Sequence, residues 1–290
     1  MKILFITGAK NVDYLNDTVF HGFVELFNDD IIDSNYQWYL SKTDKYYGNN
    51  WGRGFTVCNN LYDRSHIDRT NIEDKISQKY FDLIIYGSIH RCSDYYNLVC
   101  EKYNVNQIII LDGEDHKQIW NNFNKGIYFK RELDTIQNKN ALMIHPISFS
   151  IPSSKFMKIN NDKKYVLAPM DPRNKSSYIY NNEIDYYNQY NNSFFGYTCK
   201  KAGWDCMRHY EIIAAGCLPF FDKFELCPKY TMTNWNTSLQ YDINQLYINL
   251  CNNHKKDYSN DYNKILNNFY NYAINHFKTI DAAKYILSKI

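Results

Sequence analysis

The sequence predicts an α/β protein made of two units, each with a parallel sheet covered by helices. In the N-terminal half, short apolar runs alternate with helical patterns, and a second series of strands and helices follows a proline-containing break. Runs such as Leu83–Tyr86 (LIIY) and Ile108–Leu111 (IIIL) are apolar at every position, which is typical of strands buried on both faces of a parallel sheet. We therefore expect Rossmann-like sheets.

The N-terminal unit shows the alternating order of a parallel α/β sheet. Its expected elements are a strand at Lys2–Thr7, a helix at Asp17–Phe27, a strand at Phe81–Tyr86, a helix at Tyr95–Tyr103 and a strand at Gln107–Leu111. Between the first helix and the second strand, Asp44–Asp63 is rich in Gly and aromatic residues and lacks periodicity. We expect a long loop near a cleft, and an irregular surface excursion is the alternative.

The segment His145–Pro152 contains two prolines and is followed by the polar stretch Asn160–Lys164, so we place a domain boundary here, giving units 1–150 and 151–290. In the second unit we expect strands at Tyr165–Ala168, Ser193–Tyr197 and Leu218–Phe221. We expect one helix to begin at Asp205, and further helices at Glu183–Asn191, Ile243–Cys251, Tyr262–Phe277 and Ile280–Ser288. We expect the last helix to pack back on the first unit.

The composition is that of a folded protein, with 44% hydrophobic and 17% aromatic residues. Abundant Asn, Lys, Tyr and Ile are typical of an A+T-rich coding sequence, so a cluster of Tyr does not by itself indicate a site. With 33 basic and 31 acidic residues, the net charge of +2 provides no broad field for nucleic acid or an anionic membrane.

The sequence also predicts the cellular setting. The N-terminal MKILFITGAK has an apolar run that is too short for a signal peptide and is expected to form a strand, and no apolar stretch is long enough to span a bilayer. The 8 Cys include no C-x-x-C pair, which argues against zinc and favours reduced thiols. We expect a cytoplasmic protein without a transmembrane segment.

The segment Asp205–Pro219 carries the most information about function. Asp205 is placed to cap a helix, Gly216 to end it in a left-handed conformation, and Pro219 to prevent its continuation. Arg208 and Glu211 share one face of this helix. Free amides at a helix start favour an anion, Arg208 supplies a bidentate donor for phosphate oxygens, and Glu211 is placed to accept from sugar hydroxyls. The alternative is a surface helix with an Arg208–Glu211 ion pair.

The same segment resembles a family signature. The pattern R-x-x-E-x-x-A-x-G-x-x-P, formed by Arg208, Glu211, Ala214, Gly216 and Pro219, is similar to the donor site of GT-B glycosyltransferases, especially the exostosin-like and CgeB-like groups. The resemblance implies two Rossmann-like domains with a cleft between them. It also implies that Arg208 contacts the diphosphate of a nucleotide sugar and that Glu211 binds the ribose or the sugar. The candidate donor-binding residues are Arg208, Glu211, Lys200, Lys201, Asp205 and His209.

One departure from the family pattern limits the mechanism. Retaining GT-B enzymes of the glycogen-synthase type often carry two Glu separated by seven residues, and Gly203 stands where the first would be. The sequence therefore gives no support for that retaining mechanism, and both stereochemical outcomes stay open.

A base for the acceptor hydroxyl is expected in the first unit, where a turn follows the strand IIIL. The candidates are Asp112, Glu114, Asp115 and His116, with Asp115 favoured. An acidic solvated turn and a Mg²⁺ site on the D-x-x-D pattern are the alternatives. Gly8, His90 and Arg91 follow strands at the same edge and are expected to line the acceptor side of the cleft, and Lys130–Glu132 are further candidates.

Together, these features predict a glycosyltransferase of glycan biosynthesis that moves a sugar from a nucleotide sugar, such as a UDP- or GDP-sugar, to a hydroxyl of a glycan, lipid-linked or protein acceptor. We expect no metal and no further cofactor. The rival among enzymes is a Rossmann-type oxidoreductase, and the sequence argues against it because no G-x-G-x-x-G follows the first strand, where Gly8 stands alone. A non-catalytic carbohydrate- or nucleotide-binding protein with this fold remains the alternative.

Overall fold

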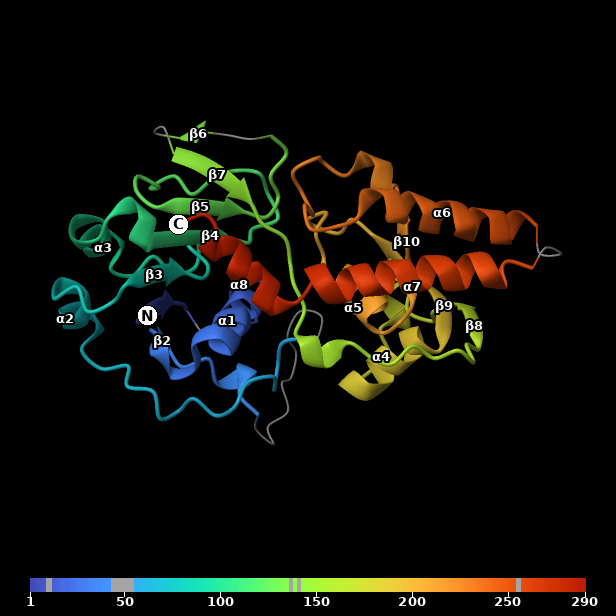
Figure 1. Cartoon of the computed structure of the whole chain (residues 1–290), viewed down its shortest axis with the longest axis horizontal. Coiled ribbons are helices and arrows are strands. Elements are labelled where there is room, and N and C mark those ends of the chain that lie inside the picture. Colours follow the sequence, from blue (N-terminus) through green and yellow to red (C-terminus); the bar gives the residue numbers. More distant parts are fainter. Residues whose placement is uncertain (9–11, 43–54, 136–137, 140–141, 254–256) are drawn as a thin grey trace.

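The computed structural model describes residues 1–8, 12–42, 55–135, 138–139, 142–253 and 257–290. Residues 44–54 of the loop predicted at Asp44–Asp63 lie outside them. The two sheets lie side by side, one in the first half of the chain (1–150) and one in the second half (151–290) (Figure 1).

The first half is an α/β unit. In chain order its elements are β1 (Ile3–Ile6), α1 (Tyr14–Phe27), η1 (Asn28–Asp30), β2 (Ile31–Asp33), η2 (Trp38–Leu40), α2 (Ile72–Ser77), β3 (Leu83–Tyr86), α3 (Tyr96–Lys102), η4 (Val105–Gln107), β4 (Ile108–Asp112), β5 (Ile127–Lys130), β6 (Asn138–Lys139) and β7 (Leu142–Pro146). The sheet order is β2-β1-β3-β4-β5-β7-β6. All neighbouring strands are parallel except β6 and β7, which pair antiparallel at one edge. The chain reverses its direction of progress across the sheet between β1 and β3, which is a topological switch point where open α/β sheets place ligands.

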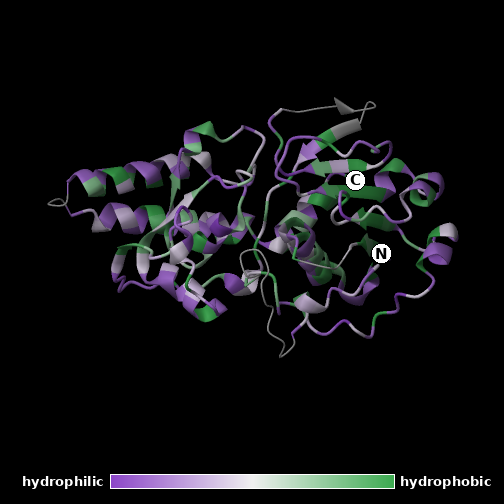
Figure 2. Ribbon diagram, turned by 180° about the vertical axis from the view of Figure 1, so that it is seen from behind, coloured by the Kyte–Doolittle hydropathy of each residue, from purple (hydrophilic) through white to green (hydrophobic). Residues whose placement is uncertain are grey.

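The central strands are buried on both faces, as their apolar runs predicted. Leu83, Ile85 and Ile109 belong to the cluster that packs against α1, whereas Ile84 and Ile108 belong to the cluster that packs against α2 and α3. Successive side chains of a strand point to opposite faces, so an unbroken apolar run fills both cores. Figure 2 shows these strands as the hydrophobic centre of the first half.

The second half carries the smaller sheet. Its elements are η5 (Ser153–Lys155), β8 (Tyr165–Leu167), η6 (Lys175–Ser177), α4 (Glu183–Asn191), β9 (Ser193–Cys199), α5 (Met207–Ala214), β10 (Leu218–Asp222), η7 (Phe224–Leu226), α6 (Thr237–Asn252), α7 (Ser259–His276) and α8 (Thr279–Leu287). The three strands are parallel in the order β10-β9-β8. Pro219 lies on the edge strand β10, where a missing backbone N–H costs no ladder bond.

The last helix, α8, packs on the first half, as predicted. His21 Nδ1 on α1 lies 2.9 Å from the hydroxyl of Thr279, and Tyr285 donates to the carbonyl of Pro146 at 2.9 Å. A Cβ on Gly22 would lie 2.0 Å from the Thr279 carbonyl oxygen, so only glycine allows α1 and α8 to approach this closely. The C-terminus of the chain is therefore part of the first core.

The two halves are joined along residues 147–164 and again between α7 and α8 (Figure 1). These two connections pair with each other, because the Ile151 amide donates to the Phe277 carbonyl at 2.7 Å and the Thr279 amide donates to the Ile151 carbonyl at 3.1 Å. No helix of the described residues is long and apolar enough to cross a membrane.

Candidate active site

The helix α5 begins at the carboxyl end of β9, facing the first half. Its N-cap residue is Cys206, with an extended backbone, and no side chain caps the first turn. The prediction that Asp205 caps this helix is therefore wrong. The helix ends as predicted, since Gly216 follows Ala215 with a φ of 70°, a left-handed conformation that glycine adopts without strain.

Asp205 instead holds the start of α5 in place. Its carboxylate accepts from the Phe149 amide at 2.7 Å and from the Tyr210 hydroxyl at 2.9 Å, and only 1% of the residue is exposed. Burial raises the pKa of Asp205 to about 7, against the opposing effect of the nearby Arg131 charge. Since its oxygens are buried and engaged, we leave Asp205 out of the ligand-binding set.

The loop before α5 is bound to the first half by an ion-paired cluster. Arg131 pairs with Asp115 and Glu132 and also donates to the backbone carbonyl of Asp205. Glu132 accepts from the amides of Trp204 and Asp205 at 3.0 and 2.9 Å. These contacts give Arg131 and Glu132, expected as site candidates, a structural role at the joint between the halves, whereas Lys130 contacts Asp112 and the Glu114 carbonyl within the first half.

Arg208, in the first turn of α5, differs from the other described arginines in its partners. The other described arginines, Arg64, Arg69, Arg91, Arg131 and Arg173, each pair with a carboxylate within 4 Å. Among the described residues, Arg208 has no ion-pair partner. One amino group of its guanidinium, Nη2, donates to the Tyr178 hydroxyl at 3.2 Å, whereas Nη1 is buried and has no partner in the described part of the chain. A buried cationic donor without a partner is costly, so an acceptor is expected there.

Glu211 lies one turn deeper on α5 and is 5% exposed. Its two oxygens accept from the Thr56 hydroxyl of the first half and from the Tyr186 hydroxyl of α4. Burial raises the pKa of Glu211, and the two hydrogen bonds and the Arg208 charge oppose that rise. The alternative of a surface helix with an Arg208–Glu211 ion pair is wrong, because both residues are described, α5 is largely buried and no such pair forms.

Several tyrosines lie around Arg208 and Glu211, and the sequence analysis did not predict them. The Tyr187 hydroxyl lies 3.1 Å from the Thr56 hydroxyl, which in turn reaches Glu211. Tyr14, the first residue of α1, lies close enough for the Glu211 charge to raise its pKa further, after the larger effect of burial. The start of α1 therefore lies near Glu211 of α5, across the space between the halves. No sequence signal marked these tyrosines, because the chain contains 28 of them.

The remaining donor-site candidates divide into two surface lysines and one buried histidine. Lys200 and Lys201 are exposed, and Lys201 donates to the Pro172 carbonyl at 2.7 Å. His209 is fully buried, with Nδ1 2.8 Å from the Thr198 hydroxyl and Nε2 2.8 Å from the Trp204 carbonyl. Burial lowers its pKa to about 3. Since both ring nitrogens are engaged, we leave His209 out of the ligand-binding set.

In the first half, His90 and Asp112 form a hydrogen-bonded pair at the carboxyl ends of β3 and β4. His90 Nε2 lies 3.0 Å from Asp112 Oδ2, and Lys130 donates to Asp112 Oδ1 at 2.8 Å. Burial would raise the pKa of Asp112, but the His90 hydrogen bond and the Lys130 charge outweigh it and hold that pKa below its usual range. Asp112 is fully buried, whereas 23% of the His90 side chain is exposed. Asp112 can orient His90 but cannot itself reach a substrate.

The other base candidates lie nearby with different partners. Glu114 accepts from Arg91 at 3.3 Å, and Arg91 also pairs with Asp13, the N-cap of α1, at 3.0 Å. The favoured Asp115 is half exposed and pairs with Arg131. His116 is exposed, with its ring 5.5 Å from that of His90.

Gly8 lies after β1, next to the Arg91 backbone. The structure thus gathers the candidates of the first half at the β1–β3 switch point and the neighbouring strand end.

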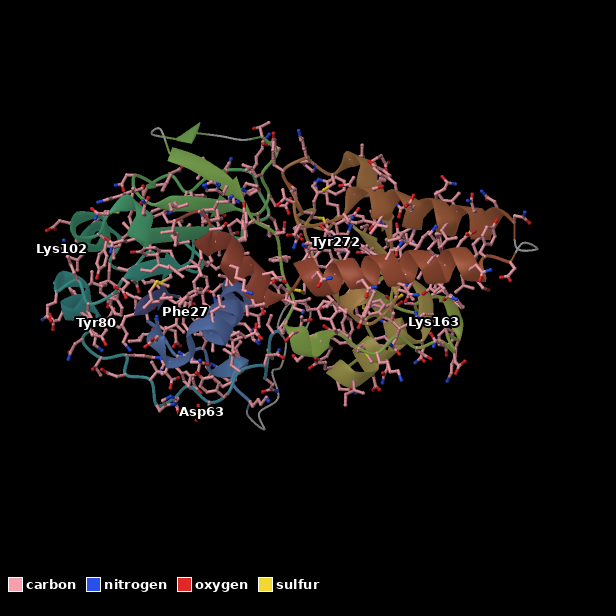
Figure 3. The ribbon with its side chains drawn as sticks, viewed as in Figure 1. Phe27, Asp63, Tyr80, Lys102, Lys163 and Tyr272 are labelled. Carbon is pink, nitrogen blue, oxygen red and sulfur yellow. The ribbon has the colours of Figure 1, made fainter. Side chains whose placement is uncertain are left out.

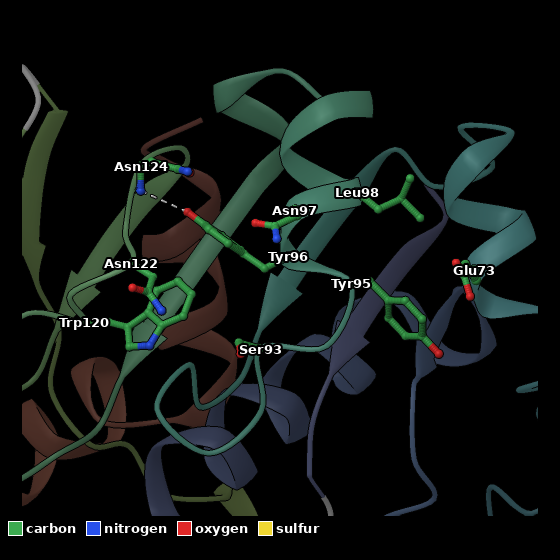
Figure 4. A pocket seen from close by; sticks show the side chains of 9 residues that line it. All are labelled: Glu73, Ser93, Tyr95, Tyr96, Asn97, Leu98, Trp120, Asn122 and Asn124. Atoms are coloured by element: carbon green, nitrogen blue, oxygen red, sulfur yellow. Dashed lines mark hydrogen bonds between the residues drawn. The ribbon is translucent and has the colours of Figure 1, made fainter.

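One cavity lies away from both groups. It has a volume of about 710 Å³ and is formed on the first half by α3 and the loop before β5 (Figure 4). None of the predicted site residues lines it. Within the described residues, no three His, Cys, Asp or Glu side chains are grouped so that they could hold a metal ion, and the 8 Cys are free thiols.

The comparisons with known proteins add no family assignment. A scan against protein-family models found no match, and a search of curated proteins found no significant relative. The resemblance of the Arg208–Pro219 segment to a glycosyltransferase signature therefore depends on the motif itself and on the geometry described above.

Proposed function

We propose that this protein is a glycosyltransferase of the GT-B type, in which the first half binds the acceptor and the second half binds a nucleotide-sugar donor. The proposal depends on Arg208, which is the one described arginine without a carboxylate partner. Its buried Nη1 group has no hydrogen-bond partner among the described residues, and it lies in the first turn of a helix that no side chain caps. Both features favour a phosphate ligand.

The donor side is formed by α5 and the residues around it. The free amides and the dipole at the start of α5 supply positive potential, and the Arg208 guanidinium supplies a planar fork for the oxygens of a diphosphate. During transfer the same groups stabilise the negative charge that develops on the departing nucleoside diphosphate. Glu211 keeps lone pairs beyond those used by Thr56 and Tyr186, and these accept from hydroxyls of the ribose or the sugar.

The acceptor side is formed at the β1–β3 switch point. We assign the base for the acceptor hydroxyl to His90 rather than to Asp115, because Asp115 is paired with Arg131. Asp112, fixed by Lys130, orients the His90 ring through Nε2 and stabilises the imidazolium that forms when the other nitrogen takes the proton. The acceptor is a hydroxyl-bearing glycan, lipid-linked saccharide or protein side chain.

The proposal needs no metal and no further cofactor, since Arg208 and the helix start supply the positive charge next to the diphosphate. The exposed Lys200 and Lys201 add to this field from the surface. The protein's chemistry is thus a direct transfer between two substrates held on opposite sides of the space between the halves.

Turnover of donors tests the proposal. The purified protein is incubated with a panel of UDP-, GDP- and CMP-sugars, and release of the nucleotide is measured for the wild type, Arg208→Ala and Lys264→Ala. Lys264→Ala is the matched control, because it removes a cation from the exposed face of α7. Release by the wild type and Lys264→Ala, but not by Arg208→Ala, supports the proposal. Binding of nucleotide without turnover of any donor would instead identify a non-catalytic binding protein.

A further inference from the structure

A second cavity lies at the junction of the two halves, and none of its lining residues belongs to the groups around Arg208 or His90. It has a volume of about 350 Å³ and is enclosed by the connection after β7, the segment before α6, and the α7–α8 corner. Tyr272, one of its lining residues, lies where the halves meet (Figure 3). Pockets for small ligands have volumes of about 300–1,000 Å³, so this cavity suits a small molecule.

Three residues that line this cavity each carry a buried side-chain oxygen without a hydrogen-bond partner in the described part of the chain. These oxygens are Ser148 Oγ, Ser150 Oγ and Asp281 Oδ2. Ser148 and Ser150 are 6% and 1% exposed. Buried polar groups are nearly always satisfied, so three unsatisfied atoms on residues that line one cavity require partners from outside the chain.

The chemistry of the wall selects the class of ligand. The Asp281 carboxylate accepts hydrogen bonds, the two serine hydroxyls both donate and accept, and Lys284 on α8 adds one cationic group to the lining. With one carboxylate and one ammonium group, the lining has no excess of either charge that would favour an anion or a cation. Tyr272 and Tyr285 add aromatic rings to the lining. A neutral molecule with several hydroxyls and apolar C–H faces matches all of these groups.

We propose that this hinge cavity binds a neutral sugar or polyol, at a site separate from the one that holds the donor. The cavity borders both connections between the halves, since Ser148 and Ser150 lie directly before Ile151, which pairs with Lys278 between α7 and α8. A bound sugar links the two connections through Ser148, Ser150 and Asp281. The site does not depend on the proposed transferase activity.

Thermal unfolding of the full chain in the presence of neutral probes tests this proposal. The probes are D-glucose, D-galactose, D-mannose, N-acetyl-D-glucosamine and sorbitol, each added to the wild type over a concentration series. At least one is expected to raise the melting temperature in a concentration-dependent way, because a ligand of the native state stabilises it by mass action. The shift should be lost in the double variant Ser148→Ala/Ser150→Ala and, should that variant not fold, in Asp281→Asn.

Two controls distinguish this site from the rest of the molecule. Asp242→Asn changes an exposed carboxylate of α6 and should keep the shift, and Arg208→Ala should keep it too, because the donor site is elsewhere. A shift that is lost in Arg208→Ala but kept in the serine variant would overturn the proposal and place the sugar at the donor site. The absence of a shift with every probe, with only ordered water on the three atoms in a crystal structure, would overturn it as well.

Discussion

Thr56 in the first half donates its hydroxyl hydrogen bond to the carboxylate of Glu211, which lies on α5 in the second half. Tyr187 on α4 contacts the same hydroxyl at 3.1 Å, so the three side chains form a polar link across the space between the halves. Because Glu211 is buried, its negative charge needs the surrounding hydrogen-bond donors for stabilisation. The helix α5 is thereby coupled to the position of the first half.

Replacing Thr56 by Val should destabilise the protein. The change keeps the shape of the side chain but removes the hydroxyl that Glu211 accepts from, and an unsatisfied buried acceptor costs about 1–3 kcal/mol. Thr56→Ser is the matched control, since it keeps the hydroxyl. Urea unfolding measures the free energy of unfolding of both variants. If Thr56→Val were as stable as the wild type, the link through Glu211 would not exist in solution.

Replacing Arg208 by Leu should leave the stability of the nucleotide-free protein unchanged or increase it, because the guanidinium carries a charge without a carboxylate partner and a buried donor without an acceptor. Arg131→Leu is the contrasting variant. It breaks the buried pair with Glu132 and the half-exposed pair with Asp115, and loss of one partner of a buried pair typically costs about 3–5 kcal/mol. A large loss of stability in Arg208→Leu, measured by the same unfolding experiment, would mean that Arg208 is structural.

Replacing His90 by Gln should slow transfer without weakening donor binding. Loss of a general base lowers kcat by about 10²–10⁴-fold, whereas the groups that hold the nucleotide are untouched. His116→Gln is the control, because His116 lies beside His90 but has no hydrogen bond to Asp112 among the described residues. The two variants are compared by steady-state kinetics with the best donor and acceptor. Equal rates in His90→Gln and the wild type would show that His90 is not the base.

Acidification should lower the free energy of unfolding, in part because His209 becomes protonated. Burial depresses its pKa from 6.5 to about 3, so the folded state holds the neutral ring. A depressed pKa contributes stability that is present above pH 6.5 and is lost as the pH falls toward 3, by about 1.4 kcal/mol for each pH unit. Stability measured by urea unfolding between these pH values should therefore fall less steeply in His209→Gln than in the wild type. The surface variant His66→Gln should keep the steep dependence of the wild type, and an equal slope in all three proteins would contradict the buried neutral ring.

Much of the fold follows from local patterns in the sequence. The apolar runs at Leu83–Tyr86 and Ile108–Leu111 predicted buried parallel strands, and α4 was predicted with the bounds that the structure has. The last helix was expected to pack back on the first unit, and α8 does so. The run Ile127–Phe129 before the candidate Lys130 was also expected as a strand and forms β5, whereas β2, β6 and β7 were not predicted, because short runs flanked by polar residues carry too little periodicity.

The candidate site was predictable only where a single helix carries it. The face shared by Arg208 and Glu211 follows from helical spacing, but their burial does not, and the prediction that Asp205 caps the helix failed for this reason. Asp205 is buried against Phe149 and Tyr210, which tertiary structure alone brings together. Thr56 reaches Glu211 across 155 positions of the chain, and no local pattern indicates such a contact. The pairing of His90 with Asp112 likewise depends on the order of strands in the sheet.

Calorimetric titration of the protein with UDP, GDP and CMP tests the central claim most directly. At least one nucleotide should bind to the wild type and to Lys264→Ala. Its affinity should fall about 10- to 100-fold in Arg208→Ala, because a hydrogen bond to a charged group is worth about 1.5–3 kcal/mol. Arg208→Lys, which keeps the charge but not the planar fork, should lie between them. The account would be contradicted if none of the three nucleotides bound, or if Arg208→Ala bound them as tightly as the wild type.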